Sequence, residues 1–167
     1  WEDVDRLKTA VGDDWPEDSI CPQRFLAPVA PPLAAQMEGR RADFQKMLHG
    51  TSAFEDAQLL IIEGAGGWLS PVTETETVAD LGFQLGIPVL IVARTGLGTI
   101  NHTLLTIESI LKRRLPIAGV VLNEASTPVD DPSVPTNGIE IETRSGVPVL
   151  GTVQFGDDRY VFRKGRS

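Results

Sequence analysis

Residues 59–62 are four consecutive large aliphatic residues, Leu-Leu-Ile-Ile, and they constrain the fold more than any other stretch. A continuous apolar run of this kind predicts a strand buried on both faces, as in the interior of a parallel sheet. Glu63 follows, and Gly64, Gly66 and Gly67 then occupy three of the next four positions. Ligands of open α/β sheets bind beyond the carboxyl ends of the strands. The stretch therefore indicates either a ligand-binding loop or a glycine-rich βα turn that leaves Glu63 in solvent.

The remaining apolar pattern predicts strands alternating with helices. Further strands are expected at residues 88–93, 117–123 and 147–153. Helices are expected at residues 2–10, 33–38, 42–48, 100–113 and 139–145, and after a capping box at residues 77–80. This alternation is typical of βαβ units. We therefore expect a single α/β domain over residues 1–167, with an open, mostly parallel sheet flanked by helices.

Composition argues against several classes of function. The formal net charge is −8, which disfavours nucleic acid as the main partner because phosphate backbones attract positive surfaces. No apolar run approaches the roughly 20 residues that span a bilayer. Cys21 is the single cysteine, so these residues form neither an internal disulfide nor a zinc cluster. We expect a cytoplasmic domain that binds neither nucleic acid nor a membrane.

Polar groups follow each predicted strand, and they should meet at one edge because parallel strands end on the same side of a sheet. They are Glu63, the turn at residues 94–98, Asn123 and the residues after Val153. A carboxylate at a strand end suits Mg²⁺, which prefers oxygen ligands. Helix N-termini after the glycine turns offer N–H groups to an anion. Asn123 suits an adenine edge by its donor and acceptor, or it merely caps a turn.

Three segments, in order, resemble the dethiobiotin synthase (dethiobiotin synthetase) family of ATP-dependent ligases. They are IIEGAGGWLSPVTETETVADL at 61–81, PVLIVARTGLGTINHTLLTIESI at 88–110 and IAGVVLNE at 117–124. Residues 27–40, which end in Glu-Gly-Arg, resemble the substrate-side loop of that family. The glycine loop alone would also suit cobyrinate and cobyrate synthases, and the run Gly-Leu-Gly-Thr-Ile-Asn-His at 96–102 favours dethiobiotin synthase. The resemblance implies a P-loop NTPase-like fold.

The resemblance also implies site residues. For ATP they are Asp3, Glu63, Gly64, Ala65, Gly66, Asn123, Glu124, Val153, Gln154 and Phe155. Asp3 and Glu63 would in addition ligate Mg²⁺. The segment Gly98, Thr99, Ile100 and Asn101 would hold the carboxylate of 7,8-diaminopelargonate across the interface of a homodimer. Gln154 stands where the family usually has proline, which departs from its pattern beside the base.

The reaction that the resemblance implies starts with a carbamate formed on 7,8-diaminopelargonate from CO₂. ATP phosphorylates the carbamate, and the second amine closes the ureido ring. Two alternatives stay open: an amide ligase of the cobyrinate-synthase or cobyrate-synthase kind, and a non-catalytic binding domain of the same fold. A glutaminase partner would be expected for the amide ligase, and an upstream P-loop would speak against the binding domain.

A P-loop requires Gly-x-x-x-x-Gly-Lys followed by Ser or Thr. The four lysines, Lys8, Lys46, Lys112 and Lys164, all lie outside such a pattern. We therefore assign no catalytic residue and expect no ATP-dependent synthesis from these 167 residues alone, because no lysine neutralises the transferring phosphate. We expect an N-terminally incomplete enzyme that lacks its first strand and P-loop. The competing expectation is a family member that has lost catalysis.

Overall fold

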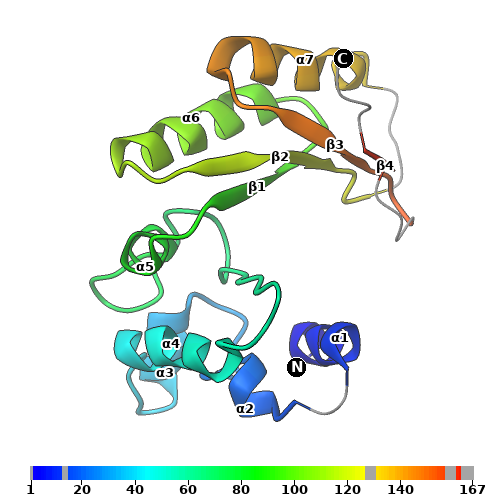
Figure 1. Cartoon of the computed structure of the whole chain (residues 1–167). Helices are drawn as coiled ribbons and strands as arrows, with labels where there is room; N and C mark the ends of the chain where they lie inside the picture. The colour runs from blue at the N-terminus through cyan, green and yellow to red at the C-terminus, as the bar shows by residue number, and fades with distance from the viewer. Residues whose placement is uncertain (1, 13–14, 127–130, 157–160, 163–167) are drawn as a thin grey trace. The chain divides into compact units, whose positions relative to one another are not determined.

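The chain forms two compact units, Trp1–Leu85 and Gly86–Ser167 (Figure 1). The structure, a computed structural model, describes residues 2–12, 15–126, 131–156 and 161–162. The expectation of one domain over the whole chain stays a prediction. None of the described helices is both long and apolar enough to cross a membrane.

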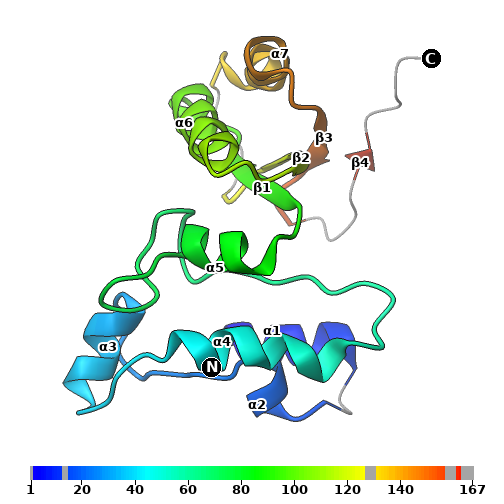
Figure 2. The same cartoon turned by 60° about the vertical axis from the view of Figure 1, so that its left-hand side comes forward.

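The first unit consists of short helices joined by loops (Figure 2). They are α1 (Glu2–Val11), α2 (Glu17–Ile20), α3 (Pro31–Met37), α4 (Phe44–Gly50), the 3₁₀-helix η1 (Thr51–Phe54) and α5 (Val78–Leu85). The helices expected near residues 2–10, 33–38 and 42–48 are therefore present. At the start of α4, the Asp43 carboxylate accepts a hydrogen bond from the backbone N–H of Lys46 at 3.1 Å. This bond satisfies one of the donors that a helix start leaves unpaired.

The predicted capping box opens α5. The backbone N–H of Thr77 donates to Asp80 Oδ2 at 2.8 Å, and the backbone N–H of Asp80 lies 3.4 Å from Thr77 Oγ1. The two reciprocal bonds satisfy backbone donors that would otherwise lack partners. The helix ends before Gly86, whose φ of 63° is left-handed and suits a glycine after a helix.

The predicted buried strand at residues 59–62 is wrong. These residues lie outside any strand, and Leu59 and Ile61 are 77% and 79% exposed. Aliphatic side chains supply apolar surface, but a strand forms only where its backbone N–H and C=O groups pair with a neighbour. In the part of the chain that the structure describes, no strand pairs with this run.

The second unit is the predicted mostly parallel α/β sheet (Figure 1). Its strands lie in the order β1 (Val89–Arg94), β2 (Ile117–Asn123), β3 (Val149–Val153) and β4 (Val161–Phe162). The first three strands are parallel, and β4 pairs antiparallel with β3. Strand β4 pairs with the open edge of β3, which supplies backbone hydrogen-bond partners whatever the side-chain pattern.

Helices α6 (Thr99–Lys112) and α7 (Val134–Ser145) lie side by side on one face of this sheet (Figure 1). The core between helices and sheet includes Ile110 and Ile141, which are fully buried, and Val120 of β2. Leu90 and Val92 alternate with the buried Ile91 along β1 and are half exposed or more, because alternate strand residues point to opposite faces. The helices therefore cover one face of β1 and leave these two side chains largely uncovered.

Helix α7 begins five residues before the predicted start at Ile139. The Pro/Asp-rich stretch ahead of it was expected to be a loop, but Pro135 occupies the first turn of the helix. Proline is tolerated there because the N–H groups of the first turn have no intrahelical partner. The helix ends at the predicted place, where Gly146 adopts a φ of 68°.

Candidate functional site

The carboxyl ends of three parallel strands gather the predicted site residues of the second unit. Arg94 at the end of β1 is the register partner of Asn123 at the end of β2, and Asn123 is the partner of Val153 at the end of β3. The polar residues that follow each strand therefore start from adjacent points on one edge. This agrees with the expectation for these three segments, whereas Glu63, which was expected at the same edge, follows no strand in the structure.

The two segments predicted to meet adenine are hydrogen-bonded to each other. The backbone N–H of Glu124 donates to the carbonyl of Val153 at 2.9 Å, and the backbone N–H of Phe155 lies 3.3 Å from Glu124 Oε2. Asn123 and Glu124 are half-buried, whereas Gln154 and Phe155 are exposed. One oxygen of the Glu124 carboxylate thus holds the backbone of Phe155. Sequence reasoning assigned Glu124 to the nucleotide and missed this bracing contact.

Helix α6 starts in a way that leaves its positive end available to an anion. Its N-cap residue is Gly98, which has a φ of 90°, and no side chain of the described residues caps the helix. A left-handed φ of this size favours glycine because a Cβ would be strained there. The backbone N–H of Thr99 turns back to the carbonyl of Gly96 at 3.2 Å. Uncapped N–H groups and the helix dipole together favour a carboxylate or phosphate at this end.

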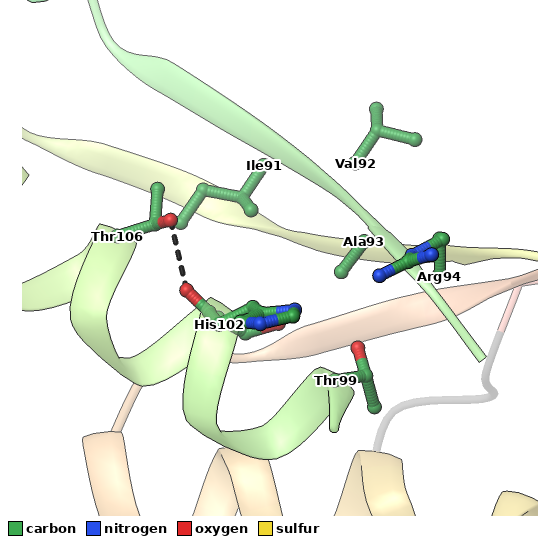
Figure 3. A pocket seen from close by; sticks show the side chains of 8 residues that line it. Ile91, Val92, Ala93, Arg94, Thr99, His102 and Thr106 are labelled. Atoms are coloured by element: carbon green, nitrogen blue, oxygen red, sulfur yellow. Dashed lines mark hydrogen bonds between the residues drawn. The ribbon is translucent and has the colours of Figure 1, made fainter. Parts of the chain in front are cut away.

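A cavity of about 170 Å³ lies beside the start of α6. Figure 3 shows that Arg94, Thr99 and His102 point into the same hollow, Arg94 from β1 and the other two from α6. Thr103, which is 2% exposed, also lines it, and its Oγ1 has no hydrogen-bond partner among the described residues. The hollow therefore combines an exposed guanidinium, an imidazole and hydroxyl groups beside the helix N-terminus.

The turn before α6 is held by an aspartate that sequence reasoning missed. Asp131 Oδ2 accepts a hydrogen bond from the backbone N–H of Leu97 at 2.9 Å. Asp131 Oδ1 accepts bonds from the Ser133 hydroxyl at 2.6 Å and from the Ser133 backbone N–H at 2.9 Å. The Ser133 hydroxyl, and after it these two backbone donors, hold the pKa of Asp131 below its ordinary value because they stabilise the carboxylate.

A buried asparagine holds the other end of the same turn. Asn137 on α7 is 3% exposed, and its Nδ2 donates to the carbonyl of Thr95 at 2.7 Å and to Ser133 Oγ at 3.2 Å. A buried amide normally has hydrogen-bond partners, because leaving it unpaired is costly. The sequence signal for this residue was its position four residues before the buried Ile141, on the core side of α7.

The glycine loop of the first unit forms a tight turn. The backbone N–H of Gly67 donates to Ser70 Oγ at 2.8 Å, and the backbone N–H of Ser70 donates to the carbonyl of Gly67 at 2.9 Å. Gly66 has a φ of 89°, so this position favours glycine. The N–H of Gly67 is therefore hydrogen-bonded within the turn. The predicted nucleotide contacts Gly64, Ala65 and Gly66 precede it and stay predictions.

The two predicted metal ligands also lie in the first unit. Asp3 is exposed in the first turn of α1, and Glu63 is exposed just ahead of the glycine loop. Carboxylate oxygens are the donors that Mg²⁺ prefers, so the two residues fit the ion in kind. Within the described residues, no group of three or more His, Cys, Asp or Glu side chains could hold a metal ion. The assignment of Asp3 and Glu63 to a metal stays a prediction.

The Glu-Gly-Arg run of the predicted substrate-side loop makes contacts inside the first unit. Glu38 Oε1 accepts a hydrogen bond from the backbone N–H of Leu26 at 2.6 Å. The Arg40 guanidinium donates to the carbonyl of Arg24 at 3.0 Å and lies 4.8 Å from the centre of the Phe25 ring. Both side chains therefore shape the loop at residues 24–26.

Comparison with known proteins covers nearly the whole chain. A family profile described as an AAA domain matches residues 1–158. A protein of Anaeromyxobacter dehalogenans named ATP-dependent dethiobiotin synthetase BioD is 50% identical over 140 residues, which are 83% of this chain and 62% of that protein. In another strain of the species, a protein of the same name is 48% identical over 166 residues, 99% of this chain and 73% of that protein.

More distant similarity extends to another genus. A protein of Bacillus thuringiensis, also named ATP-dependent dethiobiotin synthetase BioD, is 38% identical over 159 residues. The match takes in 95% of this chain and 65% of the Bacillus protein. The chain thus spans between about three fifths and three quarters of the length of these relatives.

Proposed function

Because this chain belongs to the family of ATP-dependent dethiobiotin synthetases, we propose that its protein makes dethiobiotin from 7,8-diaminopelargonate, CO₂ and ATP. The observation that carries this proposal is the 48% identity over 166 residues to a relative of that name. Fold alone would not support a choice of chemistry, because one fold hosts many functions. For the second unit, the strand-end geometry supports the choice of residues.

We assign the adenine end of ATP to the ends of β2 and β3. The side-chain amide of Asn123 offers a donor and an acceptor, which suits an adenine edge. The bonds that join Glu124 to Val153 and to Phe155 support this assignment, because they hold the two segments in a fixed relation. Gln154 is exposed beside them, and its side chain is free to approach the base.

We assign the carboxylate of 7,8-diaminopelargonate to the start of α6. The uncapped helix N-terminus after Gly98 and the guanidinium of Arg94 both favour an anion there. Ile100 and Asn101 would present their backbone N–H groups, as helix N-termini do to anions in general. Thr99, whose N–H already bonds the carbonyl of Gly96, would offer its hydroxyl, which lines the cavity. The assignment is supported by the cavity beside them, which offers room for part of a small molecule.

Mg²⁺ would be held by Glu63 and Asp3, whose carboxylates are exposed. When bound, it would neutralise charge on the phosphates of ATP. The glycine loop from Gly64 to Gly66 would lie against the nucleotide, because glycines let backbone approach a ligand closely. These roles follow from the family pattern and from the chemistry of the donors.

The proposed reaction joins CO₂ to one amine of the substrate as a carbamate. The terminal phosphoryl group of ATP passes to a carbamate oxygen and leaves ADP. The second amine then attacks the carbamate carbon, the C–O bond to phosphate breaks, and phosphate departs as the ureido ring closes. In this scheme the residues of this chain bind and orient 7,8-diaminopelargonate and ATP. Holding the carboxylate at a fixed point positions the two adjacent amines relative to the transferred phosphoryl group.

We also propose that the protein acts as a homodimer in the cytoplasm. Leu97 at the tip of the turn is 86% exposed and Leu105 on α6 is 56% exposed. Exposed apolar side chains beside a binding segment are typical of a surface that another subunit covers. The cytoplasm is expected because the single Cys21 lies half-buried and unpaired in a chain without disulfides.

The test is a reaction of the protein as its host makes it with ATP, Mg²⁺, bicarbonate and 7,8-diaminopelargonate, followed by mass spectrometry. Dethiobiotin in stoichiometric amount with ADP is the expected product. Absence of dethiobiotin would overturn the proposal. Formation of amides from glutamine or ammonia on a carboxylate substrate would favour the amide-ligase alternative, and ligand binding without ADP release would favour the binding domain.

A further inference from the structure

We propose that Asp131 and Asn137 are positioning residues, which set the Thr95–Gly98 turn and thereby aim the N-terminus of α6 at the substrate carboxylate. The inference rests on the proposed function, because it takes the start of α6 as the carboxylate site. Neither residue belongs to the segments that the family resemblance assigns to a ligand.

The two residues hold opposite groups of the same short turn. Asn137 binds the carbonyl of Thr95 at 2.7 Å, and Asp131 binds the backbone N–H of Leu97 at 2.9 Å. Gly96 lies between them, and a Cβ at that position would come within 3.5 Å of Asp131 Oδ2. The turn therefore passes closely over the carboxylate.

Side-chain packing contributes little to this turn. Leu97 at its tip is 86% exposed, and Gly96 and Gly98 have no side chains. Within one subunit, hydrogen bonds from α7 and the residues before it are therefore the main restraint on the conformation of the turn. Because the turn leads directly into Thr99, a change in its path changes the direction of the first N–H groups of α6.

The restraint is in place before a ligand arrives. Ser133 fixes the Asp131 carboxylate through its hydroxyl and backbone N–H, and the same hydroxyl accepts a bond from Asn137. Asp131, Ser133 and Asn137 thus form one connected set of bonds. A connected set with satisfied polar groups gives rigidity, which lowers the conformational cost of binding.

The negative charge of Asp131 would oppose a bound carboxylate if the role of the residue were to contact the substrate. Its two oxygens are instead occupied by donors from Leu97 and Ser133. The structure thus assigns Asp131 to the backbone of the turn, and the substrate to the N–H groups beyond Gly98. A variant that keeps the shape of Asp131 but removes its charge separates a role in holding the turn from a role in contacting the substrate.

The experiment measures steady-state kinetics of the protein as its host makes it, with Asp131→Ala, Asn137→Asp and Asp131→Asn variants. The first two are expected to raise the KM for 7,8-diaminopelargonate about 10-fold, which corresponds to the loss of one hydrogen bond of about 1.4 kcal/mol. Their kcat and their KM for ATP should stay within about twofold of wild type. Asp131→Asn keeps the shape and one acceptor oxygen but places an NH₂ group against one of the donors, so its KM for 7,8-diaminopelargonate should fall between those of wild type and Asp131→Ala. Glu140→Ala, an exposed change on α7, is the matched control.

A second substrate distinguishes positioning from general damage. The primary amide of 7,8-diaminopelargonate lacks the carboxylate charge. The KM for this amide should differ by less than about twofold between wild type and variants, because the effect of the variants on KM depends on hydrogen bonds to the charged carboxylate. An unchanged KM for the natural substrate, or an equal rise in the KM for ATP, would overturn the inference while leaving the proposed function intact. Wild-type protein that makes no dethiobiotin would overturn both.

Discussion

The carboxylate of Glu124 and the backbone N–H of Phe155 are joined by a hydrogen bond of 3.3 Å across 31 residues of sequence. The bond connects the end of β2 to the segment after β3, and a backbone bond from Glu124 to Val153 runs beside it. Glu124 therefore braces the second adenine segment even though a nucleotide contact was the expectation for it. Only one carboxylate oxygen of Glu124 makes this bond, so the residue can both hold Phe155 and contact the nucleotide with its other oxygen.

Replacing Glu124 should weaken nucleotide binding more than catalysis. We expect Glu124→Ala to raise the KM for ATP by about 3- to 10-fold, the effect of losing a hydrogen bond of about 1 kcal/mol that orders the segment. The KM for 7,8-diaminopelargonate should stay near its wild-type value. Steady-state kinetics with Glu140→Ala as control checks this. An unchanged KM for ATP would show that nucleotide binding does not depend on the hydrogen bond from Phe155 to Glu124.

Acid should release the turn before α6. The donors from Ser133 and Leu97 stabilise ionised Asp131, so its pKa in the folded chain is lower than the ordinary value of 3.8. A depressed pKa means that the contribution is complete above pH 3.8 and is lost as the pH falls through the folded value. We expect the NMR signal of the Leu97 amide to stay constant above this pH and to shift below it. Asp131→Asn should remove that shift, and a transition near neutral pH would contradict the assignment.

The glycine loop should reject a side chain at Gly66 for two separable reasons. Its φ is 89°, which costs a non-glycine residue about 1–3 kcal/mol, and a Cβ would lie 2.6 Å from Ser70 Oγ. Gly12 has a similar φ of 92° with no atom within 4 Å of the Cβ position, so Gly12→Ala measures the backbone cost alone. We expect Gly66→Ala to lower the free energy of unfolding by more than Gly12→Ala in urea titrations.

The steric part of that cost can be isolated. Compared with Ser70→Ala alone, which removes the acceptor of the Gly67 N–H, Ser70→Ala in the Gly66→Ala background should recover part of the lost stability, because it also removes the oxygen that the new Cβ meets. Equal losses for Gly66→Ala and Gly12→Ala, with no recovery in the double variant, would mean that the turn moves aside without cost.

A charge at the tip of the turn should disrupt the proposed dimer. Leu97→Glu places a carboxylate where an apolar side chain is 86% exposed, and burying an unpaired charge against a second subunit is unfavourable. We expect sedimentation to show a shift toward monomer. Leu26→Glu, at a 77% exposed position in the first unit, is the control. A wild-type protein that is monomeric at micromolar concentration would contradict the dimer.

A polypeptide of the 167 printed residues should make no dethiobiotin, because none of its four lysines lies in a P-loop pattern. Mass spectrometry of the product checks this, with the ATP-dependent dethiobiotin synthetase of Anaeromyxobacter dehalogenans as positive control. Measurable turnover by the 167 residues would show that phosphate transfer here uses other groups.

Much of the second unit could be predicted from sequence, because its strands are apolar runs closed by recognisable helix starts. The strand expected at residues 117–123 has those bounds in the structure, and α6 begins one residue before its predicted start. The capping box at Thr77 and Asp80 was predictable because its bonds are local. Residues 59–62 were mispredicted because an aliphatic run carries no information about whether a neighbouring strand is available.

The site residues at the strand ends could be predicted from the sequence. The hydrogen bonds with which Asp131 and Asn137 hold the turn before α6 could not. Register brings Arg94, Asn123 and Val153 together once the sheet is parallel. The contact of Asp131 with Leu97 spans 34 residues, and that of Asn137 with Thr95 spans 42. Such contacts depend on the paths of loops, which side-chain periodicity leaves undetermined.

Strand β1 stands at the end of the strand order, and among the described residues it pairs with β2 alone. Its far side therefore offers a ladder of amide and carbonyl groups to whatever extended chain arrives, with Leu90 and Val92 partly uncovered beside it. Water competes for these groups at low protein concentration, and another polypeptide competes better as the concentration rises. This edge is therefore a place where a strand of a second polypeptide can pair with β1.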